Sequence, residues 1–351
     1  MDLLIHVNPP EAEHRAVGHP ERPQRIQACR EALDGSGLDT EIVPASPADR
    51  ADLEAVHPAR YLDALERFVA RGGGQIDPDT YAGARSFEVA VRAAGACTAA
   101  VDAAFADGRR SFCLVRPPGH HATPERGMGF CLVNHVAVGA RRAIRTGSAE
   151  RVAIVDIDVH HGNGTQDVFW EDDAILYVSL HQYPWYPGSG ALEEVGAGAG
   201  DGTTLNVPLP AETGDATYLA AMSRVVVPAL HRFRPGLLLV SAGFDAHRRD
   251  PLALMQVSAE GFGAMVAALV EAADALCEGR VVATLEGGYD LEGLSTSFVA
   301  ALRALGGEAP AGPWPAPDPE GSREALERAE SFHRNRGTLE SGSGNADSPI
   351  E

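Results

Sequence analysis

The chain has 351 residues, a hydrophobic fraction of 44% and a formal net charge of −20 at pH 7. This length suits one large α/β domain or two small ones, and the acidic balance argues against tight binding of nucleic acid. Lysine is absent, so all 29 basic residues are arginine. No apolar run looks long enough to cross a membrane and no signal-peptide pattern begins the chain, so no membrane partner is expected.

The five cysteines are scattered and include no CxxC pair. Most of them lie in apolar or helical contexts, so we expect buried free thiols rather than disulfides or metal ligands. This usage is typical of a reducing compartment, and we expect a cytoplasmic protein. The cysteines are Cys29, Cys97, Cys113, Cys131 and Cys277.

Short apolar runs alternate with amphipathic stretches along most of the chain. The apolar runs predict strands at Leu3–Val7, Ser111–Val115, Val152–Ile157, Ala174–Leu180, Leu237–Ser241 and Val281–Leu285. The amphipathic stretches predict helices near Gln24–Leu33, Pro58–Phe68, Phe87–Phe105, Val136–Ile144, Asp215–His231, Ala259–Cys277 and Leu291–Leu305. Continuously apolar strands separated by helices indicate a single α/β domain whose mainly parallel sheet is sandwiched by helices.

The composition changes after Gly306, and no linker divides the chain before that point. We therefore expect one domain over residues 1–306 and an appendage over residues 307–351. The appendage begins with a proline-rich connector that includes Pro310, Pro313 and Pro315, which predicts a stiff, extended segment. A short charged helix near Ser322–Phe332 and a disordered acidic tail are expected to follow.

The segment 154–166 reads IVDIDVHHGNGTQ and contains the most informative residues of the chain. Residues two apart on a strand share a side, so Asp156, Asp158 and His160 are expected to converge where the strand ends. Buried carboxylates are unfavourable unless paired or metal-bound, and carboxylate oxygen with imidazole nitrogen suits a first-row ion such as zinc. Taken alone, this motif is explained better by an acidic loop at the end of a strand than by a metal site.

Two more loops with ionisable groups follow predicted strands. His120 and His121 come after the strand at Ser111–Val115, in a turn stiffened by prolines, and neutral imidazoles are the usual proton carriers near pH 7. Asp245 follows the strand at Leu237–Ser241, where it is either a third metal ligand or the N-cap of a helix.

Tyr289 follows the strand at Val281–Leu285, where its hydroxyl is placed to stabilise an oxyanion or else simply packs in the core. Aromatic residues in two further loops line a channel or only pack those loops. They are Phe130 in GMGFCLVN, and Tyr183, Trp185 and Tyr186 in LHQYPWYPGSG, which also holds His181. Parallel sheets bind ligands beyond the carboxyl ends of their strands, where all these groups gather.

The segments RPPGHH, DIDVHHGNGTQ, GFDAHRRDPL and EGGYDL occur in this order. Together they resemble the histone deacetylase family of zinc amidohydrolases, which has the arginase/deacetylase fold. The resemblance extends from about Leu3 to Leu305. HPERPQR, PPGHHA and Asn163 look closer to the class II branch and its bacterial amidohydrolase relatives, since the other main branch has aspartate at the position of Asn163.

The resemblance implies a metal centre and a structural cation site. Asp158, His160 and Asp245 would bind one zinc ion per chain, with Fe²⁺ and Co²⁺ as alternative metals. Asp156, Ser179 and nearby backbone carbonyls match the structural potassium site of the family.

The resemblance also implies roles in catalysis. His121 would act as general base and then protonate the leaving amine, with His120 beside it as electrostatic partner. Asp156 and Asn163 would orient this histidine pair, and Tyr289 would donate a hydrogen bond to the oxyanion. Residues expected to bind substrate are Phe130, Gly129, Tyr186 and Leu252.

Three functions are then open: deacetylation of acyl-lysine in proteins or peptides, hydrolysis of an acetylpolyamine or other small acyl amine, and acyl-lysine binding without catalysis. Tyr289 and the intact metal set disfavour the third. Leu252 stands where one polyamine-selective branch has a gatekeeping glutamate, and the loop before His19 is short. Both observations favour the lysine-type substrate. The acidic surface weakly favours polycations. The length of the acyl chain and the formation of a homo-oligomer are left open.

Overall fold

The computed structural model describes residues 3–308, 310 and 318–340, and its centre is an eight-stranded sheet. The strands are β1 (Leu3–Val7), β2 (Thr40–Pro44), β5 (Ser111–Leu114), β6 (Val152–Asp156), β7 (Ile175–Gln182), β8 (Thr204–Leu209), β9 (Leu237–Ala242) and β10 (Val281–Leu285). Their order is β2-β1-β5-β10-β9-β6-β7-β8, and every neighbouring pair is parallel. The predicted parallel sheet is therefore confirmed.

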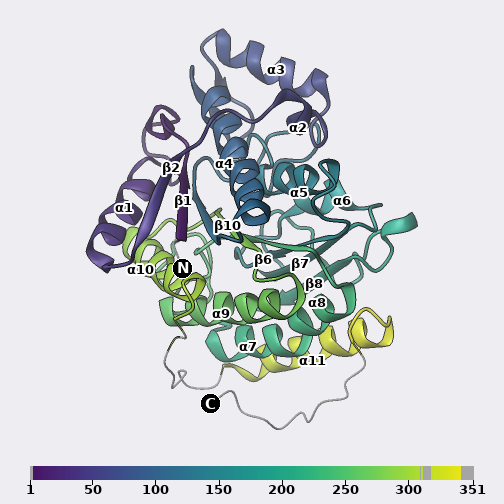
Figure 1. Ribbon diagram of the computed structural model, residues 1–351. Helices are drawn as coiled ribbons and strands as arrows, with labels where there is room; N and C mark the ends of the chain where they lie inside the picture. The colour runs from purple at the N-terminus through teal and green to yellow at the C-terminus, as the bar shows by residue number, and fades with distance from the viewer. Residues whose placement is uncertain (1–2, 309, 311–317, 341–351) are drawn as a thin grey trace.

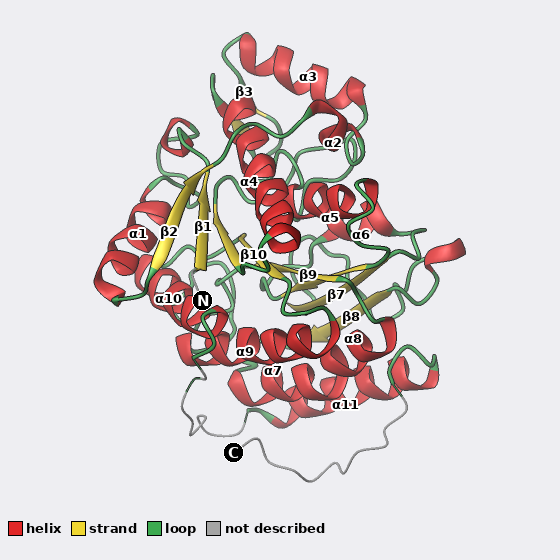
Figure 2. Ribbon diagram, viewed as in Figure 1, coloured by secondary structure: helices red, strands yellow, loops and turns green. Residues whose placement is uncertain are grey.

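Helices cover both faces of this sheet (Figure 1 and Figure 2). One face carries α1 (Gln24–Ser36), α7 (Asp215–Ala221), α8 (Val227–Phe233), α9 (Ala259–Leu276) and α10 (Leu291–Leu305). The other carries α2 (Arg50–Glu54), α3 (Ala59–Ala70), α4 (Ser86–Ala106) and α5 (His135–Arg145). A short α6 (Asn163–Phe169) and a two-stranded antiparallel ribbon of β3 (Gly74–Gln75) and β4 (Tyr81–Ala82) complete the loops around the sheet.

Side chains of the central strands alternate between two hydrophobic clusters, one under each helical layer. Ile154 and Leu239 contribute to the cluster with α4 and α5, whereas Val155 and Val240 contribute to the cluster with α9 and α10. Both sides of these strands are buried, which explains why their sequences are continuously apolar rather than alternating.

All six predicted strands are present, with small shifts at their ends. The strand predicted at Val152–Ile157 ends at Asp156, and the helix predicted at Asp215–His231 contains a π-helical turn at Met222–Val226 between α7 and α8. The edge strands β2 and β8 were not predicted. β2 reads TEIVP and is largely exposed, while β8 contains Pro208, so neither shows the apolar run of a central strand.

The helix expected near Ser322–Phe332 is α11, which spans Glu320–Asn335 and packs against β8 and α7. The His333 Nε2 atom lies 2.9 Å from the carbonyl oxygen of Asn206 in β8, and the hydroxyls of Ser322 and Thr213 lie 2.8 Å apart. The prolines of the connector at 313, 315 and 317 and the tail at 341–351 lie outside the described residues.

Helix α4 has the length and hydropathy of a membrane span, which differs from the expectation that no run is long enough. Its most apolar window is 67% buried inside the fold, where it packs against α5 and the sheet. Burial of this kind is typical of the core helix of a globular domain.

Candidate active site

Three potential metal ligands meet at the carboxyl ends of two neighbouring strands. Asp158 and His160 lie in the loop after β6, and Asp245 lies in the loop after β9. The His160 Nδ1 atom is 3.2 Å from both Asp158 Oδ1 and Asp245 Oδ2, and one ligand atom from each residue lies within 4.8 Å of the others. All three are buried, and they are the ligands predicted from the sequence.

The electrostatics of this triad suit a cation. Burial disfavours the charged form of His160, but hydrogen bonds with Asp158 and Asp245 outweigh burial and raise its pKa to about 10. Two buried carboxylates that face one imidazole attract positive charge, and a divalent ion with oxygen and nitrogen ligands satisfies all three. The donor set therefore fits zinc.

The backbone around the triad leaves room for the carboxylates. A Cβ atom at Gly243 would lie 1.9 Å from Asp158 Oδ2, and one at Gly287 would lie 1.9 Å from Asp245 Oδ2. The Gly287 N–H donates to Asp158 Oδ2 at 2.8 Å, and the Val159 N–H donates to Asp245 Oδ1 at 2.9 Å. Backbone donors thus orient each carboxylate toward His160.

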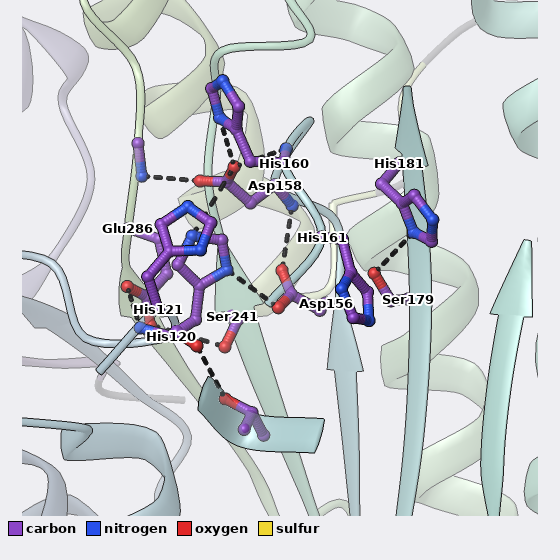
Figure 3. Close-up of polar contacts among 12 residues, drawn as sticks. His120, His121, Asp156, Asp158, His160, His161, Ser179, His181, Ser241 and Glu286 are labelled. Atoms are coloured by element: carbon purple, nitrogen blue, oxygen red, sulfur yellow. Dashed lines mark hydrogen bonds and ion pairs between the residues drawn. The ribbon is translucent and has the colours of Figure 1, made fainter. Parts of the chain in front are cut away.

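Asp156 lies beside the triad but is not one of its three candidate ligands, and its Oδ1 atom accepts from the Asp158 N–H at 3.2 Å. Strand β6 ends at Asp156, so Asp158 and His160 lie in the loop that follows it. The Asp156 Oδ2 atom also accepts from the Tyr177 hydroxyl at 3.0 Å. The same oxygen lies 3.0 Å from His120 Nδ1 (Figure 3).

The adjacent histidines His120 and His121 have opposite electrostatic environments. Burial opposes the charged form of His120, but Asp158 and Asp156 outweigh it and raise its pKa well above the usual value. Burial, together with positive charge on His120 and His160, lowers the pKa of His121 well below the usual value. The His121 Nδ1 atom lies 2.9 Å from Asn163 Oδ1. Neutral His121 can therefore accept a proton through its other ring nitrogen.

A cavity of about 480 Å³ opens onto His121 and His160. Its lining includes all four residues predicted to bind substrate, which are Gly129, Phe130, Tyr186 and Leu252. Tyr289 also lines it, with its ring edge-on to that of Phe130 at 5.6 Å, and the ring of Tyr186 lies 5.1 Å from that of His121. Gly129 has φ +56°, and a Cβ atom there would lie 2.4 Å from His121.

Tyr289 retains its proton and is held in place by two groups. Burial raises the pKa of its phenol well above the usual value, so the hydroxyl remains a donor. The guanidinium of Arg25 lies 4.9 Å from the ring centre, and the Tyr289 N–H donates to Asp250 at 2.6 Å. The phenol therefore faces the same cavity as His121 and His160.

The predicted potassium ligands Asp156 and Ser179 are cross-strand partners in β6 and β7. The Ser179 hydroxyl lies 2.9 Å from His181 Nδ1. A cation at this position stays a prediction.

One lining residue and one buried acid were not singled out from the sequence. Asp79 lines the cavity and comes from a loop that carries none of the quoted motifs. Trp185, which the sequence offered among the aromatics of a possible channel, also lines the cavity. Glu286 belongs to the quoted EGGYDL segment, and the backbone N–H groups of Gly119 and His120 donate to its side chain.

The sequence profile of the histone deacetylase domain matches residues 19–305. The chain belongs to the histone deacetylase family. As expected for this family, its parallel sheet with helices on both faces is the arginase/deacetylase fold. The crystal structure of the HDA15 HD domain superimposes with a TM-score of 0.89 at 35% sequence identity, covering 96% of this chain and 97% of that one.

Relatives of this histone deacetylase family member include plant, bacterial and archaeal proteins. The chain is 41% identical over 326 residues to histone deacetylase 10, chloroplastic, of Oryza sativa, covering 87% of this chain and 73% of that protein. It is 42% identical over 296 residues to the histone deacetylase-like amidohydrolase of Pseudomonas aeruginosa, covering 83% and 78%. A probable deacetylase of Archaeoglobus fulgidus is 40% identical over 280 residues, covering 78% and 77%.

Proposed function

We propose that this protein hydrolyses an N-acyl amide on a lysine-like amine, with zinc as its resident metal and acetate as a product. The observation that carries the proposal is the meeting of His160, His121 and Tyr289 in the wall of one cavity. These residues supply a metal ligand, a proton acceptor and a hydroxyl donor to the same space. Family membership and the names of its relatives support the deacetylase chemistry.

Asp158, His160 and Asp245 would hold the metal, which, when bound, polarises the acyl carbonyl and lowers the pKa of a water. Neutral His121 accepts the proton of the attacking water and then delivers it to the leaving amine. Tyr289 donates its hydroxyl proton as a hydrogen bond to the acyl oxygen while negative charge develops there.

The remaining polar groups orient the histidine pair. Asn163 fixes the ring of His121 through Nδ1, so that its other nitrogen faces the reaction. Asp156 holds His120, whose positive charge disfavours protonation of His121 before the substrate reacts.

The cavity lining favours a linear acyl-lysine chain. Phe130, Tyr186 and Trp185 offer aromatic faces to the methylenes of such a chain, and Leu252 adds an apolar contact. A specific observation supports acetylpolyamines as a second candidate. Asp79 also lines the cavity, and an acidic residue there would attract the distal ammonium group of a polyamine. Non-catalytic binding is the weaker candidate, because a cavity that only binds an acyl-lysine has no need of His121 and Tyr289 beside the candidate metal ligand His160.

We propose further that Fe²⁺ or Co²⁺ can replace zinc, that potassium binds near Asp156 and Ser179, and that the protein works in the cytoplasm. The five buried free cysteines fit a reducing compartment. Homo-oligomer formation is left as a proposal for solution measurement.

Parallel kinetics on two substrates test the proposed substrate class. The zinc-loaded protein is assayed for acetate release from an acetyl-lysine peptide and from acetylputrescine. We expect a higher kcat/KM for the peptide. A preference for acetylputrescine would assign the protein to the polyamine group, and no turnover of either would contradict the proposed hydrolysis of these amines.

A further inference from the structure

Glu286 is a fully buried acid directly after β10 that touches the backbone of the histidine turn. Its Oε2 atom accepts hydrogen bonds from the N–H groups of Gly119 and His120, at 2.6 and 3.1 Å. Figure 3 shows Glu286 beside His120. The Ser241 hydroxyl donates to its other carboxyl oxygen at 3.4 Å. Buried backbone donors need partners, so this one side chain accounts for two N–H groups of the turn.

The backbone of Glu286 is held from another direction. The Nη2 atom of Arg25 donates to the Glu286 carbonyl oxygen at 2.5 Å, and its Nε atom donates to the Gly288 carbonyl oxygen at 2.6 Å. The same guanidinium lies over the ring of Tyr289. The segment from Glu286 to Tyr289 is therefore fixed by Arg25, while the Glu286 side chain extends to the turn that carries the histidine pair.

Glu286 thus connects the two halves of the proposed catalytic machinery. Its backbone leads, three residues later, to the hydroxyl donor Tyr289, and its carboxyl binds the turn that leads to His121. The next residue, Gly287, donates to Asp158. We propose that Glu286 is a positioning residue that sets the placement of the His120–His121 pair relative to Tyr289 and the metal ligands. This inference rests on the proposed hydrolase function.

The proposed role depends on the acceptor atoms of Glu286 rather than on its charge. Burial raises the pKa of this carboxyl to about 8, opposed by the nearby charge of His120 and by the N–H donors. A neutral carboxyl still has one oxygen free to accept both N–H groups. Glutamine has the same shape and an amide oxygen that serves as the same acceptor. Alanine has no acceptor and leaves two buried N–H groups without a side-chain partner.

Two variants, Glu286→Gln and Glu286→Ala, test this role with two readouts. We expect Glu286→Ala to lower kcat roughly 10- to 100-fold with KM changed less than about 3-fold, as for misplaced catalytic groups. Hydrogen–deuterium exchange of the peptide spanning residues 117–122 is expected to quicken in this variant. Glu286→Gln is expected to retain kcat within about 3-fold and to keep the slow exchange.

A matched control separates positioning from general stability. Asp215 is also a buried acid, and it accepts from the N–H and hydroxyl of Ser258 at 2.8 and 2.6 Å, at the start of α9. We expect Asp215→Ala to lower the melting temperature but to leave kcat and exchange at 117–122 unchanged. Zinc content is measured for every variant by elemental analysis.

Several outcomes would overturn the positioning role. Exchange at 117–122 that is unchanged in Glu286→Ala would show that the carboxyl does not hold the turn, whatever the activity. A Glu286→Gln variant as slow as Glu286→Ala would assign the effect to charge instead. Loss of zinc in parallel with kcat would assign it to the metal centre. An inactive wild-type protein would contradict the proposed function, while the exchange readout would still test the contact.

Discussion

The Nδ1 atom of His121 lies 2.9 Å from the amide oxygen of Asn163. An amide oxygen only accepts, so the proton of neutral His121 is on Nδ1 and its other nitrogen is free to act as base. The neighbouring His120 instead faces the carboxylate of Asp156 at 3.0 Å. The two histidines therefore have different partners. His121, the proposed base, contacts the neutral amide of Asn163, and His120 contacts the carboxylate of Asp156.

Replacement of Asn163 by aspartate tests how the partner of His121 affects the pKa of that histidine. A carboxylate beside Nδ1 stabilises the imidazolium, so Asn163→Asp is expected to raise the pKa of His121, which burial lowers in the native protein. His121 must be neutral to accept a proton, so the acid limb of the kcat/KM profile should move to higher pH by roughly one unit or more. An acid limb that stays in place would show that His121 is not the group that limits activity at low pH.

Removal of either chemical group from the cavity should reduce turnover without removing the metal. His121→Ala and Tyr289→Phe are each expected to lower kcat roughly 100-fold or more, since one loses the base and the other the oxyanion donor. Tyr61→Phe is a matched control, because the Tyr61 hydroxyl donates to the Leu132 carbonyl at 2.7 Å and does not line the cavity. Full activity of either site variant, with zinc content unchanged, would refute the assigned role.

Buried His57 should make the stability of the fold depend on pH. Burial lowers its pKa from 6.5 to about 4, despite a hydrogen bond to the Pro124 carbonyl. Below pH 6.5 the unfolded chain binds a proton at His57 that the folded chain does not bind. The contribution of His57 to the free energy of unfolding is therefore fully present above pH 6.5 and is lost as the pH falls toward 4. The maximal loss from this residue is about 3 kcal/mol.

The prediction for His57 is checked by comparing how steeply the free energy of unfolding changes with pH in two proteins. Urea unfolding is measured between pH 4 and pH 7 for the wild-type protein and for His57→Gln, and the free energy of unfolding is plotted against pH. We expect a shallower decline for the variant, whatever its absolute stability. Equal slopes would show that His57 is protonated in the folded state as readily as in the unfolded chain.

The sequence predicted the centre of the sheet from local signals, because Ile154 and its apolar neighbours indicate a buried strand. The set of Asp158, His160 and Asp245 came from the resemblance to the histone deacetylase family, since the residues alone left Asp245 as either a third metal ligand or a helix N-cap. Strand alternation alone grouped Asp156 with Asp158 and His160, whereas the family resemblance implied that it orients the histidine pair. In the structure the strand ends at Asp156, and its carboxyl lies 3.0 Å from His120 Nδ1.

What the sequence missed depends on contacts between distant segments. Asp79 reaches the cavity from the loop between β3 and β4, and no motif marks that loop. Glu286 lay within a quoted motif, but its partners Gly119 and His120 are more than 160 residues earlier in the chain. Edge strand β2 is exposed and lacks an apolar run, so tertiary pairing with β1 defines it.

The proposed metal dependence of turnover is tested by removing the metal and then adding it back. Turnover of an acetyl-lysine peptide is measured for the wild-type protein and Asp245→Ala, each stripped by a chelator and then reloaded with zinc. We expect the stripped wild-type protein to be inactive and reloading to restore turnover with one zinc per chain, whereas Asp245→Ala should neither retain zinc nor recover. Turnover that survives stripping, or Asp245→Ala with stoichiometric zinc and full activity, would contradict zinc-dependent hydrolysis at this triad.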